Sequence, residues 1–325
     1  MLAYLIRRLM QSVVTVAVMS AIVFIGVSVV GDPVESLVGP QADQAERERI
    51  IRDFGLDRPV YEQYGRFVAG IVSGNFGVSF KHGEPAIKMI LERMPATMEL
   101  AFAALLMAIF IGIPLGLYAG LRPESGLAKL IMAGSIVGFS LPTFWVGLML
   151  MMVFAVMLGW LPSIGRGETA TYLGITSSFF TLDGLQHLVL PAVNLALLKI
   201  SLVIRLVRAG ASEAIRQDYV KFARAKGLKE SRVVGVHLLK NIMIPVLTVI
   251  GLEFGGLVAF SVVTETIFAW PGMGRFLIKS IEDLDRPVVV AYLVIIVLLF
   301  VLINLIVDLL YSLFDPRVRA AGRAT

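Results

Sequence analysis

Six apolar segments, separated by polar ones, divide this chain. Each is rich in Leu, Ile, Val, Ala, Met or Phe and long enough for the ~30 Å hydrocarbon core of a bilayer. The pattern predicts an all-α, polytopic membrane protein with six transmembrane helices and both termini on one side. The third segment carries Pro142, so we expect a kink or tilt there. The segments are 9–30, 97–120, 130–158, 188–208, 244–265 and 288–313.

The first long polar segment, 31–96, is charged and interrupted by Gly and Pro. We expect three short helices in it, near 43–54, 59–72 and 85–94, which form a small external subdomain. A loop without structure is the alternative. The last predicted helix has an apolar face to bury, which favours order. That face consists of Ile87, Ile90, Leu91 and Met94.

A second polar segment, between Arg205 and Pro245, is strongly basic, with nine Lys and Arg against three acids. Its centre has the spacing of one face of a short helix, i, i+3, i+4 and i+7. Gly227 follows at the position expected for a helix-terminating C′ glycine. The segment is either a capped helix offered to a soluble partner or a solvated loop that only sets topology. The helical face is Tyr219, Phe222, Ala223 and Lys226.

The basic residues also predict the orientation. Sixteen Lys and Arg lie at the two termini, in 121–129 and in 205–244, against four in 159–187 and 266–287. The positive-inside rule therefore places both termini of this multi-pass protein in the cytoplasm. Arg7 and Arg8 precede an apolar run that is too long for a cleaved signal peptide, so we expect an uncleaved first span.

Composition supports a membrane protein and gives no sign of catalysis. Hydrophobic residues make up 57% of the chain and the mean hydropathy is +0.83. The net charge of +5 is concentrated on the cytoplasmic loops, where it meets anionic lipid rather than nucleic acid. There is no cysteine, the three histidines are scattered, and a phosphate-binding loop is absent because Gly-Lys does not occur. We therefore predict no catalytic, cofactor-binding or metal-binding residue, and an intramembrane enzyme is a weak alternative.

Two kinds of residue stand out within the spans. The pairs Gly112–Gly116 and Gly116–Gly120 have the G-x-x-x-G spacing that is typical of close helix packing. Lys199 and Glu253 are ionisable residues inside apolar spans and are therefore functional candidates. They lie at similar depths, roughly 9 and 12 Å from the cytoplasmic ends of their spans. We predict that they pair and face a translocation path. Alternatively, each faces water separately, or Lys199 snorkels.

The basic loop resembles the cytoplasmic coupling loop of ABC importer permeases, specifically the oligopeptide/dipeptide/nickel family. The resemblance lies in Ala223-Arg-Ala-Lys-Gly227, the step to His237, and Asn241-x-x-x-Pro245-Val-Leu-Thr248. Four positions depart from the loop pattern of the wider importer class. Lys221, Phe222, His237 and Lys240 stand where that pattern has Glu, Ala, Ile and Pro.

Motifs along residues 1 to about 319 resemble the first permease subunit of the same family. They are Gly55–Val60 with Gln63-Tyr64, Gly74–Ser79, Arg93–Leu100, Ser140–Gly147, Thr264–Phe268 with Trp270–Gly274, Asn304 with Val307–Tyr311, and Asp315–Arg317. The tail after Arg319 matches nothing in the family.

The resemblance implies a type I ABC importer permease fold and a set of domains. These are a first helix (1–30), a periplasmic subdomain (31–96), a core transmembrane domain (97–313) with coupling loop 209–243, and a cytoplasmic tail (314–325). The ATPase-coupling residues would be Tyr219, Phe222, Ala223, Arg224, Lys226, Gly227 and Leu228.

The resemblance also implies partners: a second permease subunit, two ATPase subunits that carry ATP and Mg, and an external substrate-binding protein. We predict that 31–96 and 266–287 receive the binding protein. The turn Trp270-Pro271-Gly272 suggests a compact re-entrant element at this surface, although Trp270 alone is equally an interfacial anchor. Di- and oligopeptides are the default substrates, with nickel chelates and glutathione as alternatives. A self-contained channel or secondary transporter is the competing class, which would need internal repeats or ion sites in broken helices.

Overall fold

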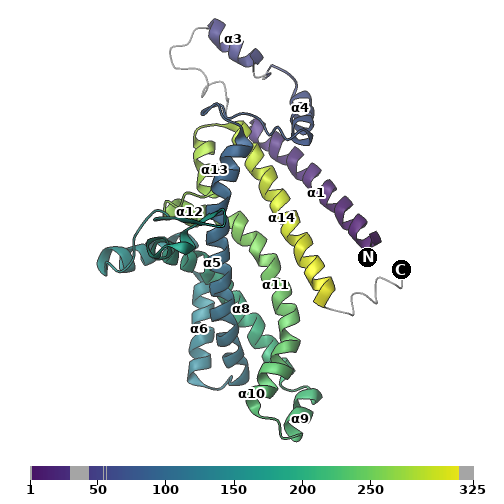
Figure 1. The fold of residues 1–325 in the computed structure, drawn as a ribbon, viewed down its shortest axis with the longest axis vertical. Coiled ribbons are helices and arrows are strands. Elements are labelled where there is room, and N and C mark those ends of the chain that lie inside the picture. Colours follow the sequence, from purple (N-terminus) through teal and green to yellow (C-terminus); the bar gives the residue numbers. More distant parts are fainter. Residues whose placement is uncertain (1, 30–43, 54, 56, 315–325) are drawn as a thin grey trace. The chain divides into compact units, whose positions relative to one another are not determined.

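The computed structural model describes residues 2–29, 44–53, 55 and 57–314, and most of them are helical (Figure 1). The predicted tail beyond Phe314, its Asp315–Arg317 motif and residues 30–43 lie outside the described residues. The elements up to the hairpin are α1 (Leu2–Val29), α3 (Gln44–Asp53), α4 (Val60–Val72), α5 (Ala86–Leu121), α6 (Gly126–Ser140), α7 (Thr143–Leu150), the π-helical η1 (Met151–Met157), β1 (Ala170–Tyr172) and β2 (Ile175–Ser177). The later elements are η2 (Ser178–Phe180), α8 (Leu182–Ala214), α9 (Asp218–Ala225), α10 (Glu230–Arg232), the π-helical η3 (Val233–Leu238), α11 (Leu239–Phe260), α12 (Val262–Ile267), α13 (Met273–Glu282) and α14 (Arg286–Phe314).

The chain forms two compact units. The first comprises Met1–Thr97 with Pro271–Leu302, and the second comprises Met98–Trp270 with Ile303–Thr325. Helices α5 and α14 contribute residues to both. The N-terminal part of the first unit ends at Thr97, next to residue 96, where the predicted external subdomain ends. The first unit also includes 271–302, which the sequence analysis assigned to the core transmembrane domain.

Polar contacts join distant segments within the first unit. The Asp285 carboxylate accepts hydrogen bonds from the Ser79 hydroxyl at 2.5 Å and from the Phe80 amide at 3.0 Å. The Thr97 hydroxyl accepts one from the Met273 amide at 2.8 Å, at the start of α13. Each contact satisfies a buried polar group, so the loop before α5 and the ends of α13 are held in one arrangement.

Glycines allow α5 and α8 to approach closely within the second unit. A Cβ at Gly116 would lie 2.7 Å from the Ile204 carbonyl oxygen and 2.8 Å from the Val207 Cβ. Gly112 and Gly120 are equally tight against α8. The G-x-x-x-G spacing thus serves helix packing, as predicted from the sequence. The same part of α8 also packs with η3 and α11 in one buried cluster, whose largest members are Val203, Val207, Leu238, Ile242, Val246 and Ile250.

The kink expected at Pro142 in the third apolar segment is present as a sharp break between two helices. Helix α6 ends at Ser140, and α7 with η1 leaves it at an angle of 108°. Leu141 is extended (φ −79°, ψ 135°) because the ring of the following proline disfavours the helical conformation. Pro142 then caps α7, where its missing N–H costs nothing. The proline therefore ends one helix and starts another.

The sequence predicted a short helix at 85–94 that is separate from the span 97–120, and this prediction was wrong. Residues 86–121 form one helix, α5, of 36 residues that continues through Pro95. The boundary was predicted where composition changes from polar to apolar. Composition reflects the surroundings of side chains, and here the backbone continues across that change.

Six spans are not confirmed. In the part of the chain that the structure describes, three helices are long and apolar enough to cross a bilayer: Ala86–Leu121, Leu182–Ala214 and Arg286–Val307. Two further pairs of helices are each apolar enough but sharply bent, and the number rises to five if each bent pair is one span. The first of these pairs is α6 with α7 and η1. The second such pair is Glu230–Met243 with Pro245–Phe260, bent by 50° at the proline-containing start of α11. The apolar part of α1, Met10–Gly26, is shorter.

The segment 159–187 contains a β-hairpin that the sequence reading did not predict. Strands β1 and β2 pair antiparallel, with Thr171 opposite Thr176. Leu173 and Gly174 form the two-residue loop, both with positive φ (50° and 81°). That geometry matches the twist of a tight hairpin. Apart from these two short strands, the all-α prediction holds for the described residues.

Candidate functional site: the basic loop and the charged residues of the long helices

One side of helix α9 packs in a small apolar cluster, called the base of α9 below. Val220 and Ala223 are buried, at 0% and 5% exposed, and pack with Val233 at the start of η3. Leu228 covers the edge of this cluster. An eight-residue helix is too short to be stable alone, so this base holds α9 in the folded loop.

The exposed side of α9 carries two aromatic rings. Phe222 is 63% exposed and Tyr219 is 39% exposed. The Lys226 ammonium lies 4.7 Å from the centroid of the Phe222 ring, within cation–π range. The predicted face was therefore partly wrong. Tyr219, Phe222 and Lys226 are on the open side, but Ala223 points into the base because Val233, ten residues later, covers it.

Gly227 ends α9 as predicted. Its φ is +74°, in the left-handed region that favours glycine. Its amide donates to the Arg224 carbonyl at 2.9 Å, and the Leu228 amide donates to the Ala223 carbonyl at 3.4 Å. These bonds satisfy the last carbonyls of the helix, as in a Schellman-type C-cap.

The Arg224 side chain pairs with Glu230 across the turn that follows α9. Its guanidinium donates two hydrogen bonds to the Glu230 carboxylate, at 3.1 and 2.6 Å. These bonds lower the pKa of Glu230 and raise that of Arg224 from their ordinary values. Both groups are solvated, so the pair orients the turn more than it stabilises the fold.

Lys199 on α8 and Glu253 on α11 form the predicted ion pair. The Lys199 ammonium donates a hydrogen bond to Oε2 of Glu253. The side chains are 23% and 31% exposed. The two residues are 54 positions apart, so the pairing depends on the packing of α8 against α11. Whether the pair lines a translocation path stays a prediction.

The predicted binding-protein contact at Trp270, Pro271 and Gly272 needs correction. Trp270 is completely buried and Gly272 is buried, whereas Pro271 is exposed. In this structure an external protein reaches only the proline of the three. The Trp270 amide donates to the Glu265 carbonyl at 2.9 Å, just after the left-handed Ala269 (φ 49°). Trp270 is therefore a core residue of a tight turn and not a surface anchor.

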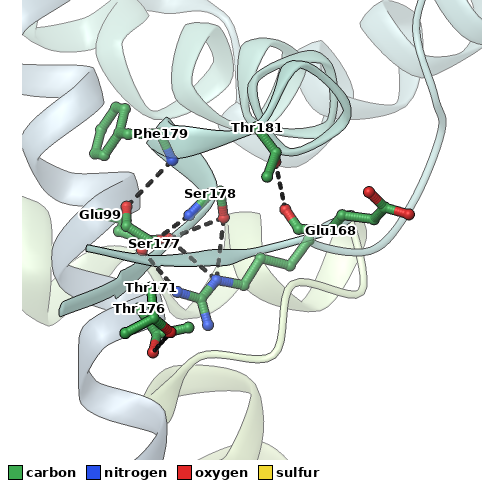
Figure 2. Close-up of polar contacts among 9 residues, drawn as sticks. Glu99, Glu168, Thr171, Thr176, Ser177, Ser178, Phe179 and Thr181 are labelled. Atoms are coloured by element: carbon green, nitrogen blue, oxygen red, sulfur yellow. Dashed lines mark hydrogen bonds and ion pairs between the residues drawn. The ribbon is translucent and has the colours of Figure 1, made fainter. Parts of the chain in front are cut away.

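The structure shows a second charge pair, more deeply buried than the first, which was not predicted from the sequence. Glu99, near the point where α5 enters the second unit, is 7% exposed and accepts two hydrogen bonds from the guanidinium of Arg166, at 3.0 and 2.6 Å. Ser178 adds its hydroxyl at 3.0 Å and its amide at 3.3 Å to the same carboxylate. Figure 2 shows Glu99 and Ser178 converging beside the hairpin. The sequence does contain a signal for this pair: Glu99 lies at the start of an apolar segment, and Arg166 is the one Lys or Arg of 159–187.

Further hydrogen bonds hold the segment around the hairpin. The Thr171 and Thr176 hydroxyls bond across the strands at 2.8 Å (Figure 2). The Thr181 hydroxyl caps α8 by accepting from the Gly184 amide at 3.0 Å and donates to the Glu168 carbonyl at 2.6 Å. The segment before α8 is thus an ordered structure with its own polar network. Among the described residues, no group of His, Asp and Glu has the arrangement of a metal site.

Comparison with known proteins assigns the family. The model of the binding-protein-dependent transport system inner membrane component matches residues 112–320, and its N-terminal counterpart matches residues 1–101. The chain is 39% identical to the di/tripeptide transport system permease protein DppB of Pseudomonas aeruginosa (strain UCBPP-PA14), covering 98% of this chain and 99% of that protein. It is 38% identical to the oligopeptide transport system permease protein AppB of Bacillus subtilis (strain 168), with the same coverage.

Two further comparisons concern another permease and the fold. The glutathione transport system permease protein GsiC of Escherichia coli O1:K1 / APEC is 36% identical over 98% of this chain and 99% of that protein. The inward-facing methionine ABC transporter MetNI has a chain that superposes with a TM-score of 0.53 at 18% identity, covering 70% of this chain and 97% of that one. At that identity the likeness shows the fold alone. The chain is thus a multi-pass membrane protein of the binding-protein-dependent transport permeases, and it belongs to their oligopeptide/dipeptide/nickel family of ABC importer permeases.

Proposed function

We propose that this chain is one permease subunit of an ATP-driven importer for di- and oligopeptides in the bacterial inner membrane, with both termini cytoplasmic. The observation that carries the proposal is α9: a capped helix, seated on its own apolar base, that exposes Phe222 and Tyr219 from the basic loop. Exposed aromatic residues on a rigid helix are suited to a pocket on a soluble partner. The names of the near full-length relatives support peptides as the cargo.

The proposal includes the other subunits of the importer. A second permease subunit completes the path, two ATPase subunits bind ATP and Mg and receive α9, and an external binding protein delivers the substrate. This chain performs no hydrolysis itself. Glutathione, itself a small peptide, is a second candidate cargo because one relative is a glutathione permease.

Uptake by the complete importer tests the proposal. We expect a radiolabelled dipeptide to enter proteoliposomes that contain this chain with its cognate permease, ATPase and binding proteins. Uptake should require ATP inside and the binding protein outside, and it should stop when the ATPase is a non-hydrolysing variant. Uptake that persists without hydrolysis would instead favour the channel or secondary-transporter class.

A further inference from the structure

The Lys199–Glu253 pair is an unusual feature of its surroundings. Lys199 is the sole charged residue between Gln186 and Arg205 in α8, and Glu253 is the sole one between Lys240 and Glu265. In the described part of the chain, each is the other's one recorded ion-pair partner. Ionisable groups at this depth are costly and mark functional positions more often than structural ones.

Apolar packing holds α8 and α11 together beside the pair. Buried Val203 of α8 and Ile250 of α11, one turn from the charged residues, belong to the same apolar cluster. The helices therefore hold the two side chains opposite each other. The side chains themselves are only partly covered, at 23% and 31% exposed. The pair thus lies next to a packed apolar cluster and is still partly exposed.

A glycine leaves room beside the charges. A Cβ at Gly256, one turn along α11 from Glu253, would lie 3.9 Å from both Oε2 of Glu253 and Nζ of Lys199. Gly256 is partly exposed. Because 3.9 Å is an ordinary van der Waals distance, a small side chain fits at this position, and glycine leaves the flank of the pair open to a small molecule.

We propose that Lys199 and Glu253 form a transit site for small zwitterions, here the free ends of a short peptide. The ligand carboxylate would pair with Lys199 and the ligand ammonium with Glu253 as the two side chains separate. This inference rests on the proposed peptide import and names what the path recognises.

The charge balance supports a zwitterion over a simple ion. A ligand of one sign would leave one of the two protein charges unpaired in an apolar span, which is costly. A zwitterion exchanges one ion pair for two and keeps every charge compensated. The net charge of the site stays zero before and after binding, so the empty pair can re-form when the ligand leaves.

Protection of an introduced cysteine tests the site directly, because the native chain has no cysteine. In the purified complete importer, Gly256→Cys reports on the flank of the pair, and Gly134→Cys on α6, where a Cβ meets nothing within 4 Å, is the matched control. We expect Ala-Ala to slow methanethiosulfonate labelling at position 256 and not at 134. N-acetyl-Ala-Ala-amide, which lacks both charged ends, should protect neither. Equal protection by both compounds, or none by either, overturns the site.

Uptake by a neutral pair gives a second test that does not depend on the cysteine variant. Lys199→Met combined with Glu253→Gln leaves no lone charge, so a purely structural pair predicts normal dipeptide uptake. A transit site predicts an assembled importer whose uptake falls about tenfold, the size expected for lost charge-assisted hydrogen bonds. Normal uptake by this double variant overturns the proposal. Absence of ATP-driven uptake in the unmodified importer would instead count against the proposed function.

Discussion

Glu99 and Arg166, 67 positions apart, form a two-pronged ion pair that ties the hairpin segment to α5 within the second unit. The carboxylate is 7% exposed and the guanidinium side chain is 18% exposed. Ser178, which is completely buried, completes the hydrogen bonding of the carboxylate. The arrangement satisfies a buried charge as fully as one carboxylate allows, which is the condition under which such a pair is tolerated.

Removing Arg166 should therefore destabilise the fold. Arg166→Met leaves Glu99 buried without a counter-charge, and we expect a loss of about 3 kcal/mol in stability. Adding Glu99→Gln should recover part of that loss because the uncompensated charge disappears. Thermal unfolding of the purified permease in detergent measures both. Glu168→Gln, at an exposed carboxylate nearby, is the control and should change little. Equal effects at 166 and 168 would mean that the pair is not stabilising.

The left-handed turn at Gly227 should be necessary for coupling. Gly227→Val forces a β-branched residue to φ +74°, at a strain of about 1–2 kcal/mol, and should displace α9 from its base. We expect weaker stimulation of ATP hydrolysis by the binding protein, with the membrane spans intact. Gly235→Val is the matched control, because Gly235 has helical φ and equally open space around its Cβ. If the two variants couple alike, the turn is not required.

The Phe222 ring should contribute to docking without contributing to the fold. Phe222→Ala removes a ring that is 63% exposed, so thermal stability should hold while ATPase subunits co-purify less. Val220→Ala, on the buried side of the same helix, should show a different pattern because it opens a cavity in the base, with a loss of roughly 1 kcal/mol or more. A Phe222→Ala importer with full ATPase recovery would count against α9 as the docking element.

Close packing of α5 on α8 should be sensitive to a single methyl group. Gly116→Ala places a Cβ 2.7 Å from the Ile204 carbonyl oxygen, so the helices must separate, at a cost of about 1–3 kcal/mol. Gly134→Ala, in α6 with open space around its Cβ, should be neutral or stabilising by about 0.5–1 kcal/mol. Unfolding temperatures of the two variants provide the comparison. A Gly116→Ala permease as stable as the Gly134→Ala one would show that the contact relaxes freely.

Several parts of the fold and site followed from local pattern. Hydropathy located the long helices α8 and α14, and the residue spacing with Gly227 located α9 and its end. These features depend on residues close together in the chain, so the local sequence is sufficient to predict them. The Lys199–Glu253 pair was also predictable, since each charge is isolated in an apolar span and has one partner of opposite sign at a similar depth.

Other parts depended on contacts that no local pattern contains. The sequence alone determined that the chain is a helical membrane protein with a long basic loop, and its motifs identified the family. Tertiary structure decided that Pro142 breaks a helix while Pro95 does not, and that Trp270 is buried. It also decided which side of α9 faces outward and that Glu99 meets Arg166. Hydropathy records the preference of each residue for water or lipid, but burial and charge pairing are set by whichever distant segment packs against it.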